Sequence, residues 1–228
     1  MKILFYDTKS YDRDFFEKLL PSYPGIEIKF IEANIHEETA ALAHGYDAIC
    51  AFVNADLGAP VIEELHRQGV KLILMRCAGY NNVDLETTAK CGIQVARVPG
   101  YSPEAVAEHA MALALTANRH THKAYIKCRE NNFALNGLMG VNFYQKIAGI
   151  IGTGKIGQAM AKICRGFGMK VIAYDLFPNK NLDFLEYVSL DELLSTSDLI
   201  SLHCPMTPET EHLINSETIA KMKDGVIL

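Results

Sequence analysis

Short apolar runs alternate with amphipathic stretches over the first hundred residues of the chain. The apolar runs fall at residues 3–6, 26–31, 48–53, 72–75 and 95–98. Helix-like segments lie between several of them, near residues 11–20 and 60–68. This alternation is typical of a parallel sheet covered by helices. We therefore predict an α/β domain over residues 1–100, and because it has no glycine fingerprint, we expect it not to hold a dinucleotide.

A turn cluster at residues 99–103 (PGYSP) follows, and then an alanine-rich segment, EAVAEHAMALALTAN. Ser102 suits a helix N-cap, and Pro103 suits the first helical position, where its missing N–H is not needed. The segment is apolar on most faces, so we expect a buried helix packed between two domains. We place the domain boundary near Gly100, with the second domain spanning residues 101–228.

The second domain repeats the α/β pattern. Candidate strands lie at residues 147–151, 171–174, 187–190, 199–203 and 226–228, with candidate helices at 191–194 and 216–222. Elements in this order predict a doubly wound Rossmann sheet built from βαβ steps. The sequence ends within the fifth candidate strand. Because an uncovered sheet edge and apolar face would result, we expect a protein truncated at its C-terminal end.

The segment KIAGIIGTGKIGQAMAKICRGFGMKVIAYD, residues 146–175, carries the most informative motif. An apolar run leads into Gly152-x-Gly154-x-x-Gly157, and a helix-like segment and a second apolar run follow before Asp175. In a dinucleotide site, Gly152 makes the tight turn, Gly154 admits the pyrophosphate and Gly157 lets the helix approach the strand. The N–H groups at the helix start would face the phosphates. The alternative, a glycine-rich loop of an ordinary α/β domain, fits less well because all these parts occur together and in order.

Asp175 predicts which nicotinamide nucleotide binds. It lies roughly 20 residues after the glycines, where a carboxylate can accept hydrogen bonds from both hydroxyls of a ribose. The same charge would repel the 2′-phosphate of NADP, and the following Leu176, Phe177 and Pro178 supply no cation to hold it. We therefore expect NAD as the cofactor.

Composition and charge exclude several classes of function. The 228 residues are 49% hydrophobic, enough for a substantial core, and the net charge of −5 argues against nucleic-acid or anionic-membrane partners. No apolar run approaches the ~18 residues of a membrane span, and the N-terminus is charged too early for a signal peptide. The six cysteines are scattered without a C-x-x-C pair. This usage favours reduced thiols in the cytoplasm, with neither a metal site nor a disulfide framework.

Four blocks of the sequence resemble the D-isomer-specific 2-hydroxyacid dehydrogenases, most closely the D-lactate subgroup. They are RCAGYNNVD (residues 76–84), VPGYSPEAVAEHA (98–110), GIIGTGKIGQAMA (149–161) and LHCPMTPETEHLIN (202–215). Together, in this order and spacing, they are far more specific than any one block, and the resemblance covers essentially the whole chain. It implies a flavodoxin-like substrate domain at residues 1–100, a Rossmann NAD-binding domain after it, and a homodimer.

The resemblance also implies residues that bind the substrate, a small 2-keto or 2-hydroxy acid. Backbone N–H groups of Ala78, Gly79 and Tyr80 would bind the substrate carboxylate, and the small residues Ala78 and Gly79 permit close approach. Tyr101 matches the tyrosine that contacts substrate in the D-lactate subgroup. Two alternatives stay open, namely Gly79 as an ordinary turn residue and Tyr101 as a packed hinge aromatic.

Further positions of the second domain match NAD contacts of the family. Besides the three glycines and Asp175, they are Thr153, Lys155, Ile156, Cys204, Pro205 and Thr210. The first three lie in the glycine loop near the pyrophosphate, and the last three follow the fourth candidate strand, beside the adenosine half of NAD. A solvated lysine remains an alternative for Lys155, as does a small buried hydrophobe for Cys204.

The family's catalytic arginine, glutamate and histidine would follow Leu228, so no catalytic residue is assigned in this sequence. Its own histidines are poor substitutes. We expect His109 in the buried helix, His203 in a packing role, and His120 and His122 on a solvated helix face. General acid–base catalysis contributes about 10²–10⁴-fold to such reactions, so we expect no useful turnover from the 228-residue polypeptide by itself.

The sequence thus predicts an NAD-dependent D-2-hydroxyacid dehydrogenase. Our leading hypothesis is a D-lactate dehydrogenase that interconverts pyruvate/NADH and D-lactate/NAD. One alternative is a non-catalytic NAD-sensing or partner-binding protein on the same scaffold. Another is a dehydrogenase for a larger 2-keto acid, whose pocket Tyr101 and the loop at residues 80–82 would shape.

Overall fold

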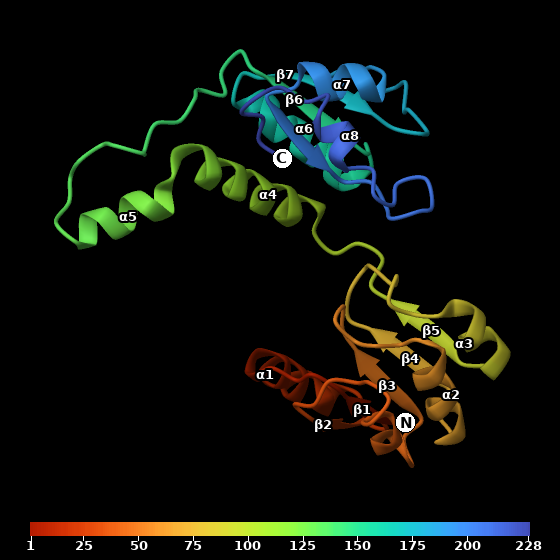
Figure 1. Cartoon of the computed structure of the whole chain (residues 1–228). Helices are drawn as coiled ribbons and strands as arrows, with labels where there is room; N and C mark the ends of the chain where they lie inside the picture. The colour runs from red at the N-terminus through yellow and green to blue at the C-terminus, as the bar shows by residue number, and fades with distance from the viewer. The chain divides into compact units, whose positions relative to one another are not determined.

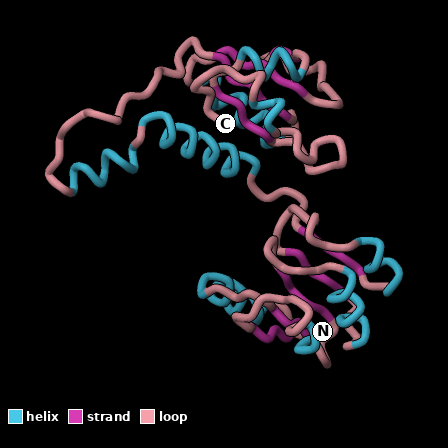
Figure 2. The backbone as a smooth tube through the Cα atoms, in the orientation of Figure 1, coloured by secondary structure: helices cyan, strands magenta, loops and turns pink.

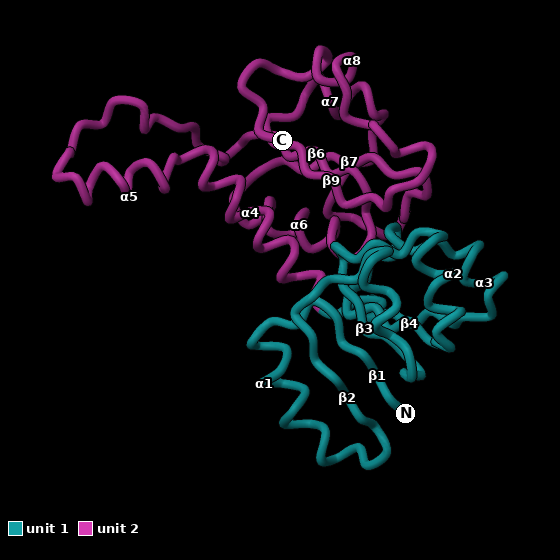
Figure 3. The backbone as a smooth tube through the Cα atoms, turned by 60° about the horizontal axis from the view of Figure 1, so that its bottom comes forward, with its two compact units in different colours: residues 1–101 teal, residues 102–228 magenta.

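The computed structural model describes residues 1–228, which form two compact units, Met1–Tyr101 (unit 1) and Ser102–Leu228 (unit 2; Figure 3). Each unit contains one parallel sheet with helices (Figures 1 and 2). The predicted α/β fold class is therefore confirmed. None of the helices combines the length and the apolar character that crossing a membrane requires.

The sheet of unit 1 has five strands in the order β2-β1-β3-β4-β5, and all pairings are parallel. The strands are β1 (Lys2–Phe5), β2 (Glu27–Phe30), β3 (Ala48–Ala51), β4 (Leu72–Met75) and β5 (Gln94–Arg97). This is the flavodoxin-like order, in which the carboxyl ends of all strands meet at one edge. Each predicted apolar run of this region overlaps one strand.

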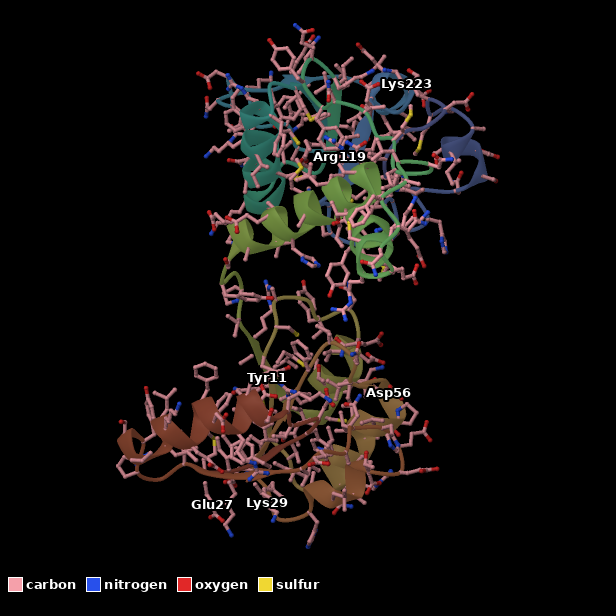
Figure 4. The ribbon with its side chains drawn as sticks, turned by 90° about the vertical axis from the view of Figure 1, so that its left-hand side faces the viewer. Tyr11, Glu27, Lys29, Asp56, Arg119 and Lys223 are labelled. Carbon is pink, nitrogen blue, oxygen red and sulfur yellow. The ribbon has the colours of Figure 1, made fainter.

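Burial explains which strands are central. Every residue of β3 is buried, whereas β2 at the sheet edge alternates between exposed and half-buried positions. Figure 4 shows Glu27 and Lys29 of β2 projecting away from the sheet. The intervening Ile28 and Phe30 pack against a core of Ile3, Phe5, Ala48 and Cys50.

The α-helices of unit 1 are α1 (Ser10–Leu19), α2 (Ala59–Arg67) and α3 (Leu85–Cys91), with two short 3₁₀ helices, η1 (Leu20–Ser22) and η2 (Ala40–Ala43). Helix α3 was not predicted. Its N-cap is Asp84, whose carboxylate accepts a hydrogen bond from the backbone N–H of Thr87 at 2.9 Å. It ends at Gly92, which has the left-handed conformation, with φ of +67°. These two caps allow a helix of only seven residues.

The sheet of unit 2 has four parallel strands in the order β8-β7-β6-β9. They are β6 (Ile147–Ile151), β7 (Lys170–Tyr174), β8 (Glu186–Tyr187) and β9 (Leu199–Leu202). Numbered within the unit, this is order 3-2-1-4, as in the first four strands of a Rossmann sheet. The expected strand at residues 226–228 is only a single parallel bridge between Ile227 and Leu199.

The helices of unit 2 are α4 (Pro103–Arg119), α5 (Thr121–Arg129), α6 (Lys155–Gly166), α7 (Leu190–Thr196) and α8 (Ser216–Ile219). Ser102 caps α4 as predicted, because its hydroxyl accepts the N–H of Ala105 at 3.3 Å. The expected helix at residues 216–222 is shorter than predicted and ends at Ile219.

One prediction for unit 2 was wrong. A strand at residues 187–190 was expected, but β8 ends at Tyr187 and Leu190 begins helix α7. Ser189 caps this helix by accepting the N–H of Glu192 at 3.2 Å, so the S-x-x-E capping pattern outweighs the apolar run.

Helix α4 was expected to be buried, as a helix packed between two domains. Only one face of it is buried, through Ala107, Met111 and Ala114, whereas Leu113 and His109 are exposed. His109 is therefore not in the core of unit 2, and the expected position between the two domains stays a prediction. Alanine is small enough to be compatible with either face of a helix, so the alanine-rich sequence did not show which face packs.

Candidate functional site

The glycine loop of unit 2 connects an inner strand to a helix, because β6 ends at Ile151 and α6 begins at Lys155. Gly152 has φ of +90°, and a Cβ there would lie 2.5 Å from the backbone nitrogen of Cys204. A Cβ on Gly157 would clash with the carbonyl oxygen of Gly152. Both positions require glycine so that α6 and the segment after β9 can approach the turn closely.

Gly154 differs from its two neighbours, because a Cβ there would meet nothing within 4 Å. It is the N-cap of α6 in an extended conformation (φ −65°, ψ −171°) and provides no side-chain cap. The fold itself therefore does not need glycine at this position. The first N–H groups of α6 have no acceptor within the helix, and the helix dipole favours an anion there. The open space at Gly154 and these N–H groups fit the diphosphate of a dinucleotide.

Asp175 lies directly after β7 and is held by three hydrogen bonds. Its Oδ2 accepts the backbone N–H of Thr153 at 2.6 Å and the Thr153 hydroxyl at 2.8 Å, and its Oδ1 accepts the N–H of Phe177 at 2.9 Å. A carboxylate has about four acceptor positions, so one stays open. The expectation that Asp175 accepts hydrogen bonds from both hydroxyls of a ribose stays a prediction.

The hydrogen bonds of Asp175 also set its charge. Burial raises the pKa of this carboxyl group, but the bonds from Thr153 and Phe177 outweigh burial and bring the pKa below its ordinary value. Asp175 is therefore negatively charged at neutral pH. This charge suits a ribose hydroxyl and opposes a phosphate at the same position.

A cavity of about 270 Å³ lies where β6, β7 and β9 end, at the carboxyl edge of the unit 2 sheet. Of the predicted cofactor residues, it brings together Gly152, Gly154, Asp175, Cys204, Pro205 and Thr210. Thr153, Lys155, Ile156 and Gly157 do not line it. Sequence reasoning did not assign to the site the other lining residues, which are Ile151, Tyr174, Leu176, Phe177, His203, Thr207 and Leu213. Most of them are sequence neighbours of predicted residues, so adjacency was the available signal.

The segment after β9 forms one wall of this cavity. His203 donates its N–H to the carbonyl of Ile151 at 2.7 Å, and its half-buried imidazole contacts the Ser201 hydroxyl at 2.9 Å. Burial raises the pKa of the Cys204 thiol and lowers that of His203, so both are neutral at pH 7. The Thr210 hydroxyl donates to the carbonyl of Pro205 at 2.6 Å and thereby closes the turn that follows.

The predicted substrate loop of unit 1 follows β4. Arg97, at the end of β5, donates to the carbonyl of Ala78 at 2.7 Å, and its guanidinium lies 5.0 Å from the centre of the Tyr80 ring. The Cys77 thiol donates to the carbonyl of Gly79 at 3.2 Å. A Cβ on Gly79 would meet nothing within 4 Å, so a ligand has room to approach this backbone. Tyr101, the last residue of unit 1, is 68% exposed.

Comparison with known proteins identifies the family. Residues 111–228 match the family model described as "D-isomer specific 2-hydroxyacid dehydrogenase, NAD binding domain". A 2-hydroxyacid dehydrogenase homolog of Haemophilus influenzae is 50% identical, over 100% of this chain and 69% of the relative. The chain belongs to the D-isomer-specific 2-hydroxyacid dehydrogenase family.

Solved structures support the same assignment. The apo-structure of D-lactate dehydrogenase from Escherichia coli is 49% identical with a TM-score of 0.90, over 100% of this chain and 72% of that one. D-lactate dehydrogenase from Aquifex aeolicus, complexed with NAD and lactic acid, is 34% identical with a TM-score of 0.83. The match covers 98% of this chain and 67% of that one. The family assignment makes the protein an oxidoreductase with NAD as its cofactor, as the sequence predicted.

Proposed function

We propose that this chain is part of a D-lactate dehydrogenase, which reduces pyruvate with NADH and oxidises D-lactate with NAD. The observation that carries the proposal is the similarity to the Escherichia coli D-lactate dehydrogenase over the entire chain, in both sequence and fold. Bound NADH supplies the hydride. The residues of this chain bind and orient the two reactants.

In this proposal residues 1–100 form the substrate domain and residues 101–228 the NAD-binding domain. Backbone N–H groups of Ala78, Gly79 and Tyr80 bind the substrate carboxylate. Support comes from the open space at Gly79 and from Arg97, which fixes the loop through Ala78 and adds a positive charge beside it. We also assign Tyr101 to the substrate, because an exposed phenol can donate a hydrogen bond to a small acid.

We assign the diphosphate of NAD to the loop at residues 152–157. The N–H groups of Gly154, Lys155 and Ile156 bind it, and the ammonium group of Lys155 adds a positive charge. Thr153 and Gly157 shape the loop rather than line the cavity. Asp175 accepts a hydroxyl of the adenosine ribose, while Cys204, Pro205 and Thr210 form the opposite wall.

The substrate proposal is tested with the protein isolated from its natural source. NADH oxidation is measured with pyruvate and with straight and branched 2-keto acids of increasing size, and we expect the highest kcat/KM for pyruvate. A maximum at a larger acid would contradict the D-lactate assignment in favour of another 2-hydroxyacid. NADH binding without oxidation of any acid tested would instead favour a non-catalytic NAD-binding protein.

We further propose that the protein is a cytoplasmic homodimer. Helix α5 has no buried residue, and apolar side chains on it and after it are exposed, including Phe133 (74%), Leu135 (76%) and Met139 (87%). Exposed apolar groups concentrated on one segment are typical of a protein interface, and most soluble oligomers pair identical chains. All six cysteines are free, which fits a reducing compartment.

A further inference from the structure

A second hydroxyl, from Tyr187, lies behind the Thr153–Asp175 pair. Tyr187 is on β8, where it stands opposite Ala173 in the pairing with β7. Its hydroxyl oxygen lies 2.8 Å from Oγ1 of Thr153 and accepts the backbone N–H of Asn179 at 3.1 Å. Three segments that are separate in the sequence are thereby joined at one carboxylate.

Counting protons fixes the direction of the bond between Tyr187 and Thr153. A hydroxyl has one proton, and an ionised carboxylate only accepts hydrogen bonds. The Thr153 proton is already donated to Oδ2 of Asp175 at 2.8 Å, so Thr153 can only accept from Tyr187. The hydrogen bonds therefore run in one direction, from Asn179 N–H to Tyr187, Thr153 and finally Asp175. Each bond in such a chain polarises and strengthens the next.

The chain of bonds restricts the rotation of Asp175. Oδ2 is held by the backbone and hydroxyl of Thr153, while Oδ1 keeps one open acceptor position. The same tyrosine also anchors the loop after β7, through Asn179. Leu176 and Phe177 of this loop line the cavity, yet Phe177 is 86% exposed, so packing alone does not hold the loop in place.

We propose that Tyr187 is a positioning residue that sets the preference for NAD over NADP. It acts through Thr153 by holding Asp175 in the orientation that accepts a ribose hydroxyl and repels a 2′-phosphate. This inference rests on the proposed assignment of Asp175 to the ribose. Tyr187 is not one of the residues that line the cavity, and its ring packs against the core of unit 2.

The test is a double-mutant cycle on the 228-residue chain, with the Kd values of NAD and NADP measured by isothermal titration calorimetry. Tyr187→Phe keeps the packed ring and removes only the hydroxyl. We expect it to weaken NAD binding about five- to tenfold, the size of one hydrogen bond, and to leave NADP within about twofold. In a chain that already carries Asp175→Ala, the same substitution should change NAD binding by less than about twofold, because its target is gone.

Controls separate positioning from general destabilisation. Tyr144→Phe removes a hydroxyl from an exposed tyrosine of the same unit that does not line the cavity, and it should leave both Kd values unchanged. Thr153→Val interrupts the chain of bonds at its next link and should reproduce the loss of NAD preference. If Tyr187→Phe does not fold, Thr153→Val is measured instead, in the parent chain and in the chain with Asp175→Ala. A loss of NAD preference in the parent chain only would support the inference, and any other result would overturn it.

The outcomes distinguish the inference from the assignment on which it rests. The ratio of NAD affinity to NADP affinity is the quantity compared. If Tyr187→Phe leaves this ratio unchanged while Asp175→Ala lowers it, the role of Tyr187 is overturned and the ribose assignment stands. If Tyr187→Phe weakens the binding of NAD and NADP equally, with and without Asp175→Ala, Tyr187 has only a structural role and the inference is overturned. An unchanged ratio in Asp175→Ala would overturn the ribose assignment itself and the inference with it.

Discussion

At the scale of single residues, the three glycines of the loop differ in why they are glycine. Gly152 and Gly157 are required by close backbone contacts within the protein. Gly154 has no such neighbour, and we propose that its missing side chain leaves room for the diphosphate of NAD. The G-x-G-x-x-G spacing predicted these separate roles, and the contacts at Gly152 and Gly157 agree with the roles predicted for them within the fold.

This difference predicts opposite effects of two alanine substitutions. Gly157→Ala places a Cβ against the carbonyl of Gly152, so we expect the free energy of unfolding to fall by more than about 2 kcal/mol. Gly154→Ala should change that free energy by less than about 1 kcal/mol but weaken NAD binding by roughly tenfold or more. Urea unfolding and calorimetry measure the two quantities. Normal NAD binding by Gly154→Ala would contradict the assignment of the diphosphate.

A second prediction at this scale concerns pH. The pKa of Asp175 is lowered in the folded protein, so its charged form contributes stability above the unfolded value of 3.8, and this contribution is lost as pH falls through the lower folded value. Asp175 itself should therefore add no pH dependence to NAD affinity between about pH 8 and about pH 5. His203, another lining residue, has a pKa that burial lowers from 6.5, so the parent protein is compared with a variant that keeps His203. The matched variant Asp175→Asn should bind NAD more weakly over the same range. The ratio of the parent's NAD affinity to that of Asp175→Asn should stay constant over this range, and a change in the ratio near pH 6 would contradict the charge state that we assign.

The partners of Asp175 show where sequence reasoning ends. The acid itself was predicted from its distance to the glycines. Its contacts with Thr153 and, through it, Tyr187 depend on the pairing of β7 with β8 and on the turn after β6. Side-chain contacts between separate strands follow from register and loop geometry, and no local pattern in the sequence encodes them.

At the scale of elements, most strands and long helices were predictable because their apolar positions are periodic and their ends carry turn residues. The exceptions were decided by caps. The run at residues 187–190 resembled a strand, but Ser189 and Glu192 favour a helix start. Helix α3 has too few residues for a clear periodicity, and only Asp84 and Gly92 mark it.

The cap of α7 gives a prediction at this scale. Ser189→Ala removes the acceptor of the Glu192 N–H, so we expect the free energy of unfolding of unit 2 to fall by about 1 kcal/mol. The control is Ser195→Ala on the same helix, whose exposed hydroxyl bonds only to carbonyl groups of the helix. Equal effects of the two substitutions in urea unfolding would show that the cap is not what starts α7.

At the scale of the whole molecule, the resemblance of four sequence blocks predicted the family, and the comparisons confirm it. Both sheet orders fit the flavodoxin-like and Rossmann folds that this resemblance implied. Composition did not predict the apolar exposure of α5 and the segment after it. Exposure of this kind is visible only when the packing of each helix is known.

Self-association is the prediction that belongs to this scale. We expect the 25.3 kDa chain to elute as a dimer, with about twice its mass by light scattering. Leu135→Glu places a charge among the exposed apolar side chains of the proposed interface and should give a monomer, whereas Leu42→Glu, at an exposed apolar position of unit 1, should not. A parent protein that is monomeric, or a Leu135→Glu variant that stays dimeric, would contradict the proposed interface.

The central claim is that unit 2 binds NAD through the loop at residues 152–157 and Asp175. A crystal structure of the chain with NAD tests it most directly. The account predicts the diphosphate within hydrogen-bond distance of the N–H groups of Gly154, Lys155 and Ile156, and a ribose hydroxyl on the open acceptor position of Asp175. NAD bound elsewhere, with the cavity beside Gly154 empty, would contradict it.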